Sequence, residues 1–252
     1  MRHRFRAALA FPLALASAAA LAARPFNTDD ARIVDPDGWQ IESYVKGQRG
    51  SRQTEFWFLP ARNFGGELDR FEFTLGGSLV DPDPGGRSNL LLAQVKTLLK
   101  PLTTNGAGFA LTVGLSRLKP GATVEVVETP FGVTTVPGES STSTQYNPYL
   151  NAIASVSAFD DAVVLHFNGG ATRNTAADRT IGNWGVGAEL AVTDRVIGIA
   201  ETYGLSQGKP AYQTGIRFWA IPARWQIDGT YGWQHASPAN LRWISLGVRI
   251  LW

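Results

Sequence analysis

Apolar and polar residues alternate with a period of two along most of this chain. The C-terminal stretch is the clearest case, where Ile244, Leu246, Val248, Ile250 and Trp252 alternate with mixed residues that include Ser, Gly and Arg. This is the pattern of a β-strand with one apolar face. We find no convincing amphipathic helix, and no apolar run of about 18 residues follows the N-terminus. The pattern therefore predicts an all-β protein.

About twelve segments share this alternation, and turn residues separate them. Most approach the roughly 9–11 residues that a tilted strand needs to cross a bilayer. The expected strands lie near residues 39–46, 53–60, 70–78, 88–99, 107–117, 148–157, 162–171, 182–192, 196–204, 210–219, 224–232 and 242–252.

The links between the expected strands alternate in length, as outer-membrane barrels alternate long extracellular loops with tight periplasmic turns. Asp160-Asp161 and Asp194-Arg195 mark tight turns. The alternation weakens near the N-terminus, where link 61–69 is as long as 79–87. Counted back from the C-terminus, the links are 233–241 (long), 220–223 (short), 205–209 (moderate), 193–195 (short), 172–181 (long), 158–161 (short) and 118–147 (very long).

The composition favours a membrane barrel over a soluble β protein, which needs surface charge. Only 17% of residues are charged, against roughly 25% in soluble domains. Aromatic residues stand at or near expected strand ends, where interfacial rings are common: Trp39, Trp184, Trp225, Tyr231 and Trp252. We expect an antiparallel up-and-down transmembrane β-barrel of about twelve strands in the bacterial outer membrane, most simply a monomer. A soluble periplasmic β protein is the alternative.

The first residues have the features of a secretory signal. Arg2, Arg4 and Arg6 precede a short apolar stretch, and Ala20-Leu21-Ala22 resembles a cleavage site. The expected division is a cleaved signal peptide at 1–22, a periplasmic segment at 23–37 and the barrel at 38–252. Removing three arginines turns the formal charge of +2 into −1, so the basic pI near 9.0 belongs to the signal.

The end of the chain resembles the C-terminal signal that outer-membrane proteins present to the barrel-assembly machinery. Leu246, Val248, Ile250 and Trp252 match that signal, with Trp where Phe is commoner. This resemblance implies the assembly machinery as a partner, and the apolar outer face of the expected barrel implies outer-membrane lipid as a second.

The stretch after the signal carries a second resemblance. RPFNTDDARIVDPDGWQIESY is similar to the start of an outer-membrane transporter family also described as the MetA-pathway of phenol degradation family. The matching residues are Thr28, Asp29, Asp30, Gly38, Trp39, Gln40 and Glu42, and the region from Trp184 through GKPAYQTGIRF resembles the late strands of that family. The resemblance implies a channel-like barrel that passes small hydrophobic or aromatic molecules.

The polar face of the strands is expected to line the lumen. These side chains either form a polar constriction or fill and stabilise a narrow interior, and for any single residue the second role is favoured. Both charge signs are present, so ion pairs between adjacent strands are expected. The candidates are Gln40, Glu42, Glu72, Lys96, His166, Glu189, Gln213, Arg217, Asp228 and Arg249.

Two further features have more than one interpretation. Asp29 and Asp30 could cap a turn, bind a cation, or let the N-terminal segment plug the periplasmic mouth, and turn capping is the interpretation we favour. The long link 118–147 either folds inward or protrudes, and VEVVETPFGVTTV within it favours a protruding hairpin.

Other functional classes find little support in the sequence. The chain has no Cys and no Gly-x-Ser-x-Gly motif, and only His166 and His235 follow the signal. We expect no enzyme, metal site, cofactor or nucleic-acid partner. The hypotheses are a passive channel for small, hydrophobic or aromatic solutes, or else a non-transporting structural or surface-binding barrel with link 118–147 as its contact element.

Overall fold

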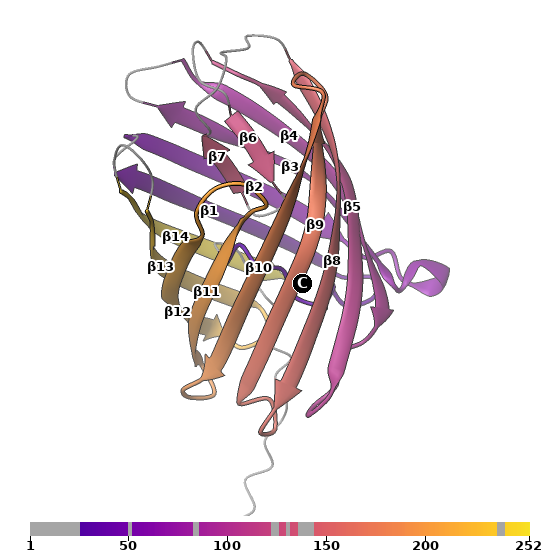
Figure 1. Cartoon of the computed structure of the whole chain (residues 1–252). Coiled ribbons are helices and arrows are strands. Elements are labelled where there is room, and N and C mark those ends of the chain that lie inside the picture. Colours follow the sequence, from indigo (N-terminus) through magenta and orange to yellow (C-terminus); the bar gives the residue numbers. More distant parts are fainter. Residues whose placement is uncertain are drawn as a thin grey trace, which may run out of the picture.

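Twelve antiparallel strands form a closed barrel in the computed structural model (Figure 1). The structure describes residues 26–49, 52–82, 86–121, 126–129, 132–135, 144–235 and 240–252. The barrel strands are β1 (Trp39–Arg49), β2 (Gln53–Arg62), β3 (Phe71–Pro82), β4 (Ser88–Lys100), β5 (Ala107–Lys119), β8 (Gln145–Ala158), β9 (Val163–Asn174), β10 (Arg179–Ala191), β11 (Val196–Leu205), β12 (Ala211–Ile221), β13 (Trp225–Gln234) and β14 (Leu241–Leu251).

Each barrel strand overlaps one of the twelve predicted segments, and the all-β prediction is confirmed. A 3₁₀ turn, η1 (Gly66–Leu68), lies between β2 and β3. In the part of the chain that the structure describes, no helix is long and apolar enough to span a membrane. The signal-peptide prediction falls on residues 1–22, which lie outside the described residues.

The strands follow one another around the barrel in chain order, and β1 closes it against β14. The register of this seam runs from Gln40 opposite Leu251 to Arg49 opposite Arg242. At the end of the seam where β1 starts, the N–H of Trp39 donates to the Trp252 carbonyl at 2.8 Å, and the N–H of Trp252 donates to the Trp39 carbonyl at 3.1 Å. Closure pairs every strand on both sides, which a barrel in lipid requires because lipid offers no partner to an open edge.

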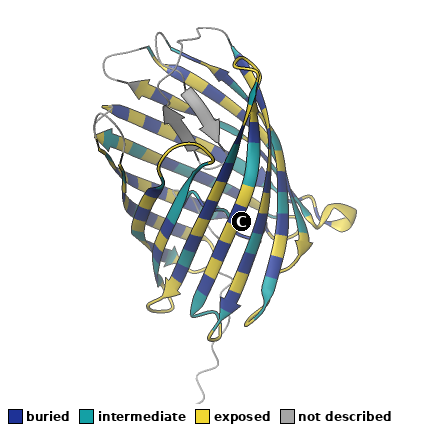
Figure 2. Ribbon diagram, viewed as in Figure 1, coloured by how far each residue is buried: buried dark blue, intermediate teal, exposed yellow. Residues whose placement is uncertain are grey.

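Buried and exposed residues alternate along each strand, so the ribbon is banded in Figure 2. On β14, Ile244 and Leu246 are about 60% exposed, whereas Ser245 and Arg249 are 1% and 2% exposed. Large apolar side chains thus cover the outside, and most charged side chains on the strands point inward. This inversion of the usual soluble pattern fits a surface in contact with lipid.

The two ends of the barrel differ in their connections. The 120–144 connection contains a small separate antiparallel sheet of β6 (Val126–Thr129) and β7 (Gly132–Thr135), so a strand pair forms there as expected. Figure 1 draws this pair within the outline of the barrel, with β6 close to β9, and not as the protruding hairpin that the sequence favours. The connection stands at one end, whereas β1 starts and β14 ends at the other. Because outer-membrane barrels carry long loops outside the cell, we assign the end with the 120–144 connection to the exterior.

The predicted link lengths are only partly correct. The tight turns at 159–162 and 192–195 are present, but the link predicted as long at 172–181 is a turn of 175–178. The reason is that β9 and β10 extend as a hairpin, with Arg179 opposite Asn174. Polar and Gly-rich sequence there continues the strands beyond the membrane-facing part instead of forming a loop.

Candidate functional site

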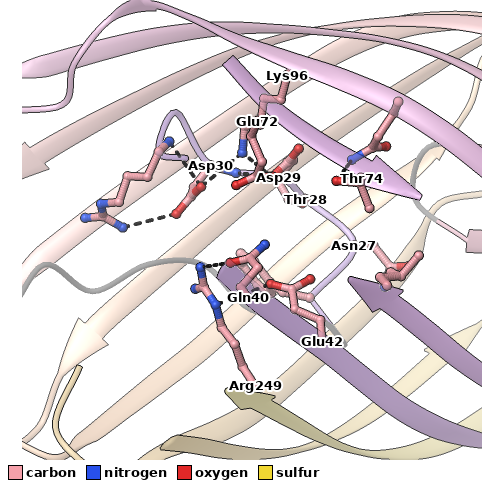
Figure 3. A pocket seen from close by; sticks show the side chains of 14 residues that line it. Asn27, Thr28, Asp29, Asp30, Gln40, Glu42, Glu72, Thr74, Lys96 and Arg249 are labelled. Carbon is pink, nitrogen blue, oxygen red and sulfur yellow. Dashed lines mark hydrogen bonds and ion pairs between the residues drawn. The ribbon is translucent and has the colours of Figure 1, made fainter. Parts of the chain in front are cut away.

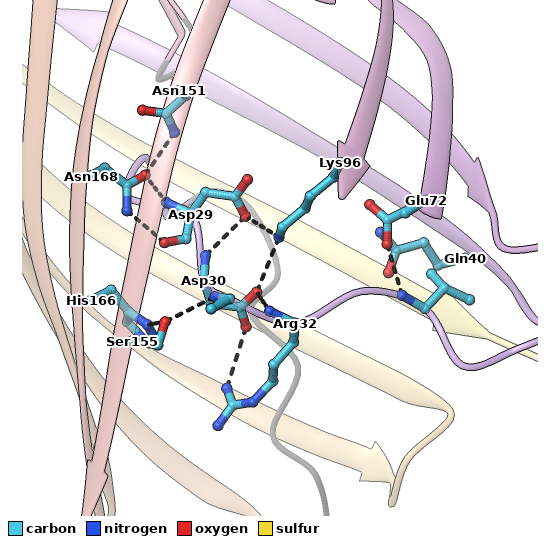
Figure 4. A network of polar contacts seen from close by, with 12 residues as sticks. Asp29, Asp30, Arg32, Gln40, Glu72, Lys96, Asn151, Ser155, His166 and Asn168 are labelled. Carbon is cyan, nitrogen blue, oxygen red and sulfur yellow. Dashed lines mark hydrogen bonds and ion pairs between the residues drawn. The ribbon is translucent and has the colours of Figure 1, made fainter. Parts of the chain in front are cut away.

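Residues 26–34, the inner segment, run through the interior of the barrel and not outside it. Phe26, Thr28, Asp30, Ala31 and Val34 are at most 3% exposed. The sequence predicts a periplasmic segment at 23–37, but its described part at 26–34 is enclosed by the strands. Figure 4 shows the segment crossing between walls, with side chains from several strands pointing at it.

Side chains of the wall bind the backbone of the inner segment. Glu201 on β11 accepts hydrogen bonds from the backbone N–H groups of Asn27 (2.9 Å) and Thr28 (2.7 Å). Glu72 on β3 accepts one from the N–H of Val34 at 2.8 Å. Hydrogen bonds to charged acceptors are the stronger class, worth roughly 1.5–3 kcal/mol each. Wall carboxylates thus hold both ends of the segment.

The backbone in the middle of the inner segment is bound by uncharged side chains. The N–H of Asp29 donates to Asn168 Oδ1 at 2.8 Å, and the Asn168 amide returns a hydrogen bond of 2.8 Å to the Asp29 carbonyl. The N–H of Ala31 donates to Ser155 Oγ at 2.9 Å. These contacts satisfy backbone groups that have no strand partner, which a buried chain requires.

The acidic pair of the segment meets a buried lysine. Lys96 Nζ on β4 lies 2.8 Å from Asp29 Oδ1 and 3.3 Å from Asp30 Oδ1. Arg32 Nη1 lies 3.3 Å from Asp30 Oδ2. Burial by itself raises the pKa of the Asp30 carboxyl, but the charges of Lys96 and Arg32 outweigh burial and lower the pKa to about 2. Turn capping, the favoured interpretation of these aspartates, is therefore not their main role, although Asp30 also accepts from the N–H of Arg32 at 3.2 Å.

A second charged group joins the segment to the opposite wall. Arg32 lies 3.7 Å from Glu189 on β10, and Glu189 also pairs with Arg217 on β12. His166 Nε2 stands 3.7 Å from Glu189 Oε1, and its Nδ1 is 2.9 Å from Ser155 Oγ. The polar groups on β8, β9, β10 and β12 therefore form one network that includes the segment. Figure 4 shows the part of it around Ser155, His166 and Asp30.

Glycines on β10 leave room for the segment. A Cβ added at Gly187 would stand 2.5 Å from Phe26 Cζ, and one at Gly185 would stand 2.9 Å from Thr28 Oγ1. Phe26 itself packs with Ile197, Ile199, Trp219 and Leu251, all inward-facing and buried. The start of the segment thus lies in an apolar pocket, beside the two glycines of β10 that carry no side chain.

The segment crosses the full width of the barrel. Its first anchor, Glu201, is on β11, and its last, Glu72, is on β3. In the closed order of twelve strands, β11 and β3 are six strands apart in either direction. A chain tied to opposite walls divides the lumen. A cavity of about 40 Å³ remains beside it, lined by Asn27, Thr28, Gln40, Glu42, Glu72, Thr74, Lys96 and Arg249 among others (Figure 3).

The ten residues named from sequence as lumen candidates all have buried side chains inside the barrel, at most 7% exposed. Glu72, Lys96 and Glu189 contact the inner segment through polar groups, and His166 through the ring of Phe26. The others pair with wall groups: Arg249 with Gln40 and Glu42, Gln213 with Glu201, Asp228 with Gln226, and Arg217 with Glu189.

The sequence missed the residues that hold the segment's backbone, namely Glu201, Asn168 and Ser155. It also missed an apolar part of the inner wall. Tyr44 stacks on Trp57 with ring centroids 5.8 Å apart, in a buried cluster with Leu59, Val80, Leu90, Leu92, Leu118 and Tyr149. This cluster lies on the exterior side of the inner segment. The apolar run from Leu90 to Leu99, which has apolar residues on both faces, was its only signal.

The motif residues Gly38 and Trp39 connect the inner segment to β1. A Cβ at Gly38 would stand 2.8 Å from the carbonyl oxygen of Asp35, so the turn after the segment requires glycine. Among the described residues, no group of three or more His, Asp or Glu side chains is placed to hold a metal ion.

A family model described as "Uncharacterised conserved protein UCP029691" matches residues 10–252. The chain belongs to this family. The family match does not test the resemblance to the phenol-degradation family, which stays a prediction. No curated protein matches the sequence.

Solved porin structures resemble the barrel. The KdgM porin in complex with disordered oligogalacturonate is 12% identical, with a TM-score of 0.54, and the match covers 84% of this chain and 98% of that chain. The KdgM porin alone gives 12% identity and a TM-score of 0.53 over the same shares of the two chains. The barrel thus has the fold of bacterial outer-membrane proteins.

Proposed function

We propose that this protein is an outer-membrane channel whose lumen is closed at rest by its own inner segment. The observation that carries the proposal is the path of residues 26–34 from Glu201 on β11 to Glu72 on the opposite wall. Eight-stranded barrels fill their interior with wall side chains, whereas wider barrels enclose additional space. Here twelve strands enclose space that a separate piece of chain occupies.

The way the segment is held supports a removable plug. Its backbone donates hydrogen bonds to wall side chains, its aspartates form ion pairs with Lys96, and the segment does not extend the sheet. Water can replace such contacts, so displacement would leave the seam between β1 and β14 intact. A barrel built only for structure would not need a segment that is separable from its wall.

The lining favours small solutes that combine an apolar face with hydrogen-bonding groups. The Tyr44–Trp57 stack offers aromatic surface, and Gln94 accepts a hydrogen bond of 2.7 Å from the Tyr149 hydroxyl beside it. Inward carboxylates on the wall include Glu42, Glu55, Glu72, Glu189, Glu201 and Asp228. Because of this acidity, we do not extend the acidic sugar named with the KdgM porin to this chain.

Planar-bilayer recording tests the proposal. The full mature chain should show rare, brief openings, and a variant that lacks residues 23–34 should conduct steadily. Folding of both proteins is checked by the heat-dependent shift in gel mobility that barrels show. A folded, plug-free barrel without conductance would contradict the channel and favour the second candidate, a structural or surface-binding barrel.

A further inference from the structure

The exterior rim of the barrel is basic, and the periplasmic rim is not. Among the described residues, the exterior end carries nine Arg and Lys residues against the acidic residues Asp81, Glu128 and Asp178. The opposite end mixes acids such as Asp160 and Asp194 with bases such as Arg195 and Arg224. The nine are Arg49, Arg52, Arg87, Arg117, Lys119, Arg173, Arg179, Lys209 and Arg242.

Two of these arginines face each other directly. Arg49 on β1 is the register partner of Arg242 on β14, and both side chains are exposed on the outer face. Like charges directly opposite each other across a strand pair are destabilising. Neither guanidinium has an ion-pair partner in the described part of the chain. An anion held between them would offset the repulsion.

A groove beside this pair has both a charged and an apolar part. It has a volume of about 950 Å³ and is lined by Arg49, Arg52 and Arg87 together with the outward-facing Phe56 and Leu79. Phe56 is 48% exposed and Leu79 is 42% exposed, in the apolar surface that contacts lipid. Asp81 pairs with Arg87 at 3.0 Å, which leaves the groove with an excess of positive charge.

We propose that this rim binds a phosphorylated glycolipid of the outer leaflet. Guanidinium groups bind phosphate oxygens in a bidentate fashion, which suits Arg49, Arg52, Arg87 and Arg242 to the headgroup. The acyl chains lie along Phe56 and Leu79, where the groove joins the lipid-facing surface. A free anion would bind the arginines but would make no contact with the apolar residues Phe56 and Leu79, so the geometry favours the lipid. This site does not depend on conduction through the lumen.

The test uses the refolded mature chain in detergent, with lipid A as the probe. The R49Q/R242Q double variant should bind lipid A about tenfold more weakly than the wild type, as expected for loss of two charged contacts. The matched control is R195Q/R224Q, which removes two arginines from the periplasmic rim and should bind like the wild type. A double variant that binds as well as the wild type, or a control that loses binding equally, would overturn the proposal.

Two further arms keep the test decisive. Without lipid A, R242Q should raise the unfolding temperature because it removes the repulsion from Arg49, and with lipid A it should lower it relative to the wild type. Phe56→Ser should weaken the binding of lipid A but leave the binding of inorganic phosphate unchanged. If inorganic phosphate alone stabilises the barrel as much as lipid A does, the rim is an anion site and the lipid assignment is wrong.

Discussion

Lys96 Nζ on β4 lies 2.8 Å from the carboxylate of Asp29 in the inner segment, and both atoms are inside the barrel. The lysine side chain is only 5% exposed, so it has few partners other than Asp29 and Asp30. This contact makes the segment's hold on the wall testable with single substitutions.

Lys96→Met should release the inner segment without disturbing the sheet. Methionine keeps the length of the side chain but removes the charge that balances Asp29 and Asp30. Breaking a buried ion pair costs about 3–5 kcal/mol, so the fraction of time spent open should rise by roughly a hundredfold or more. Single-channel recording measures this. Lys100→Met, on the same strand but exposed, is the control and should behave like the wild type.

A bulky residue at Gly187 should displace the segment without changing any charge. Gly187→Leu places atoms where the ring of Phe26 lies, because even a Cβ would stand 2.5 Å from that ring. We expect conductance close to that of the plug-free barrel. Gly169→Leu on β9 introduces the same side chain where no atom lies within 4 Å of the added Cβ. Equal conductance in the two variants would argue against release of the segment.

An engineered disulfide should lock the segment in place. The chain has no cysteine, so Ala31→Cys with Ser155→Cys gives one possible bond. The hydrogen bond of 2.9 Å between the Ala31 N–H and Ser155 Oγ keeps the two Cα atoms within about 6.8 Å, inside the range that a disulfide spans. Combined with Lys96→Met, the oxidised protein should stay closed and the reduced protein should open. If the conductance is the same before and after addition of reductant, the segment does not gate the lumen.

The strands could be predicted from sequence because lipid and lumen impose opposite polarities on alternate residues. The inner face of β14 illustrates this: Ser245 and Arg249 are buried between exposed aliphatic neighbours. Where inward-facing residues are themselves apolar, alternating polarity no longer identifies which residues face the lumen. On β11, Ile197 and Ile199 point inward with Glu201 because they pack around Phe26. Nothing in the spacing of that strand marks Glu201 as the anchor of a distant segment.

The path of the inner segment was harder to predict for another physical reason. Residues 26–34 have no strand periodicity, because side chains scattered over four strands satisfy their backbone groups. A fifth strand, β4, contributes Lys96, which pairs with the Asp29 side chain. Each of these partners is an ordinary lumen residue when considered alone. Plugging of the barrel is one of the interpretations that the sequence allows for Asp29 and Asp30. The contact of both aspartates with Lys96 follows only from the fold.

Strong acid should loosen the segment through Asp30. Its pKa is lowered from 3.8 to about 2 in the closed barrel, so the open state binds the proton more readily between these values. The stabilisation is complete above pH 4 and is lost as the pH falls toward 2, by roughly 2 kcal/mol in all. Conductance should therefore rise over that window. Asp30→Asn removes this group, so its response to acid should be smaller and its openings at neutral pH more frequent.

The terminal tryptophan separates packing at the seam from recognition during assembly. Trp252 stacks on Trp39 with centroids 6.4 Å apart and planes within 6° of parallel. Trp252→Ala and Trp39→Ala remove the same stack. When both variants are refolded in detergent, their unfolding temperatures should therefore lie below that of the wild type by similar amounts. In cells, Trp252→Ala should reduce the amount of folded barrel further than Trp39→Ala does, because it also removes the expected assembly signal. Equal yields in cells would show that Trp252 acts through the seam alone.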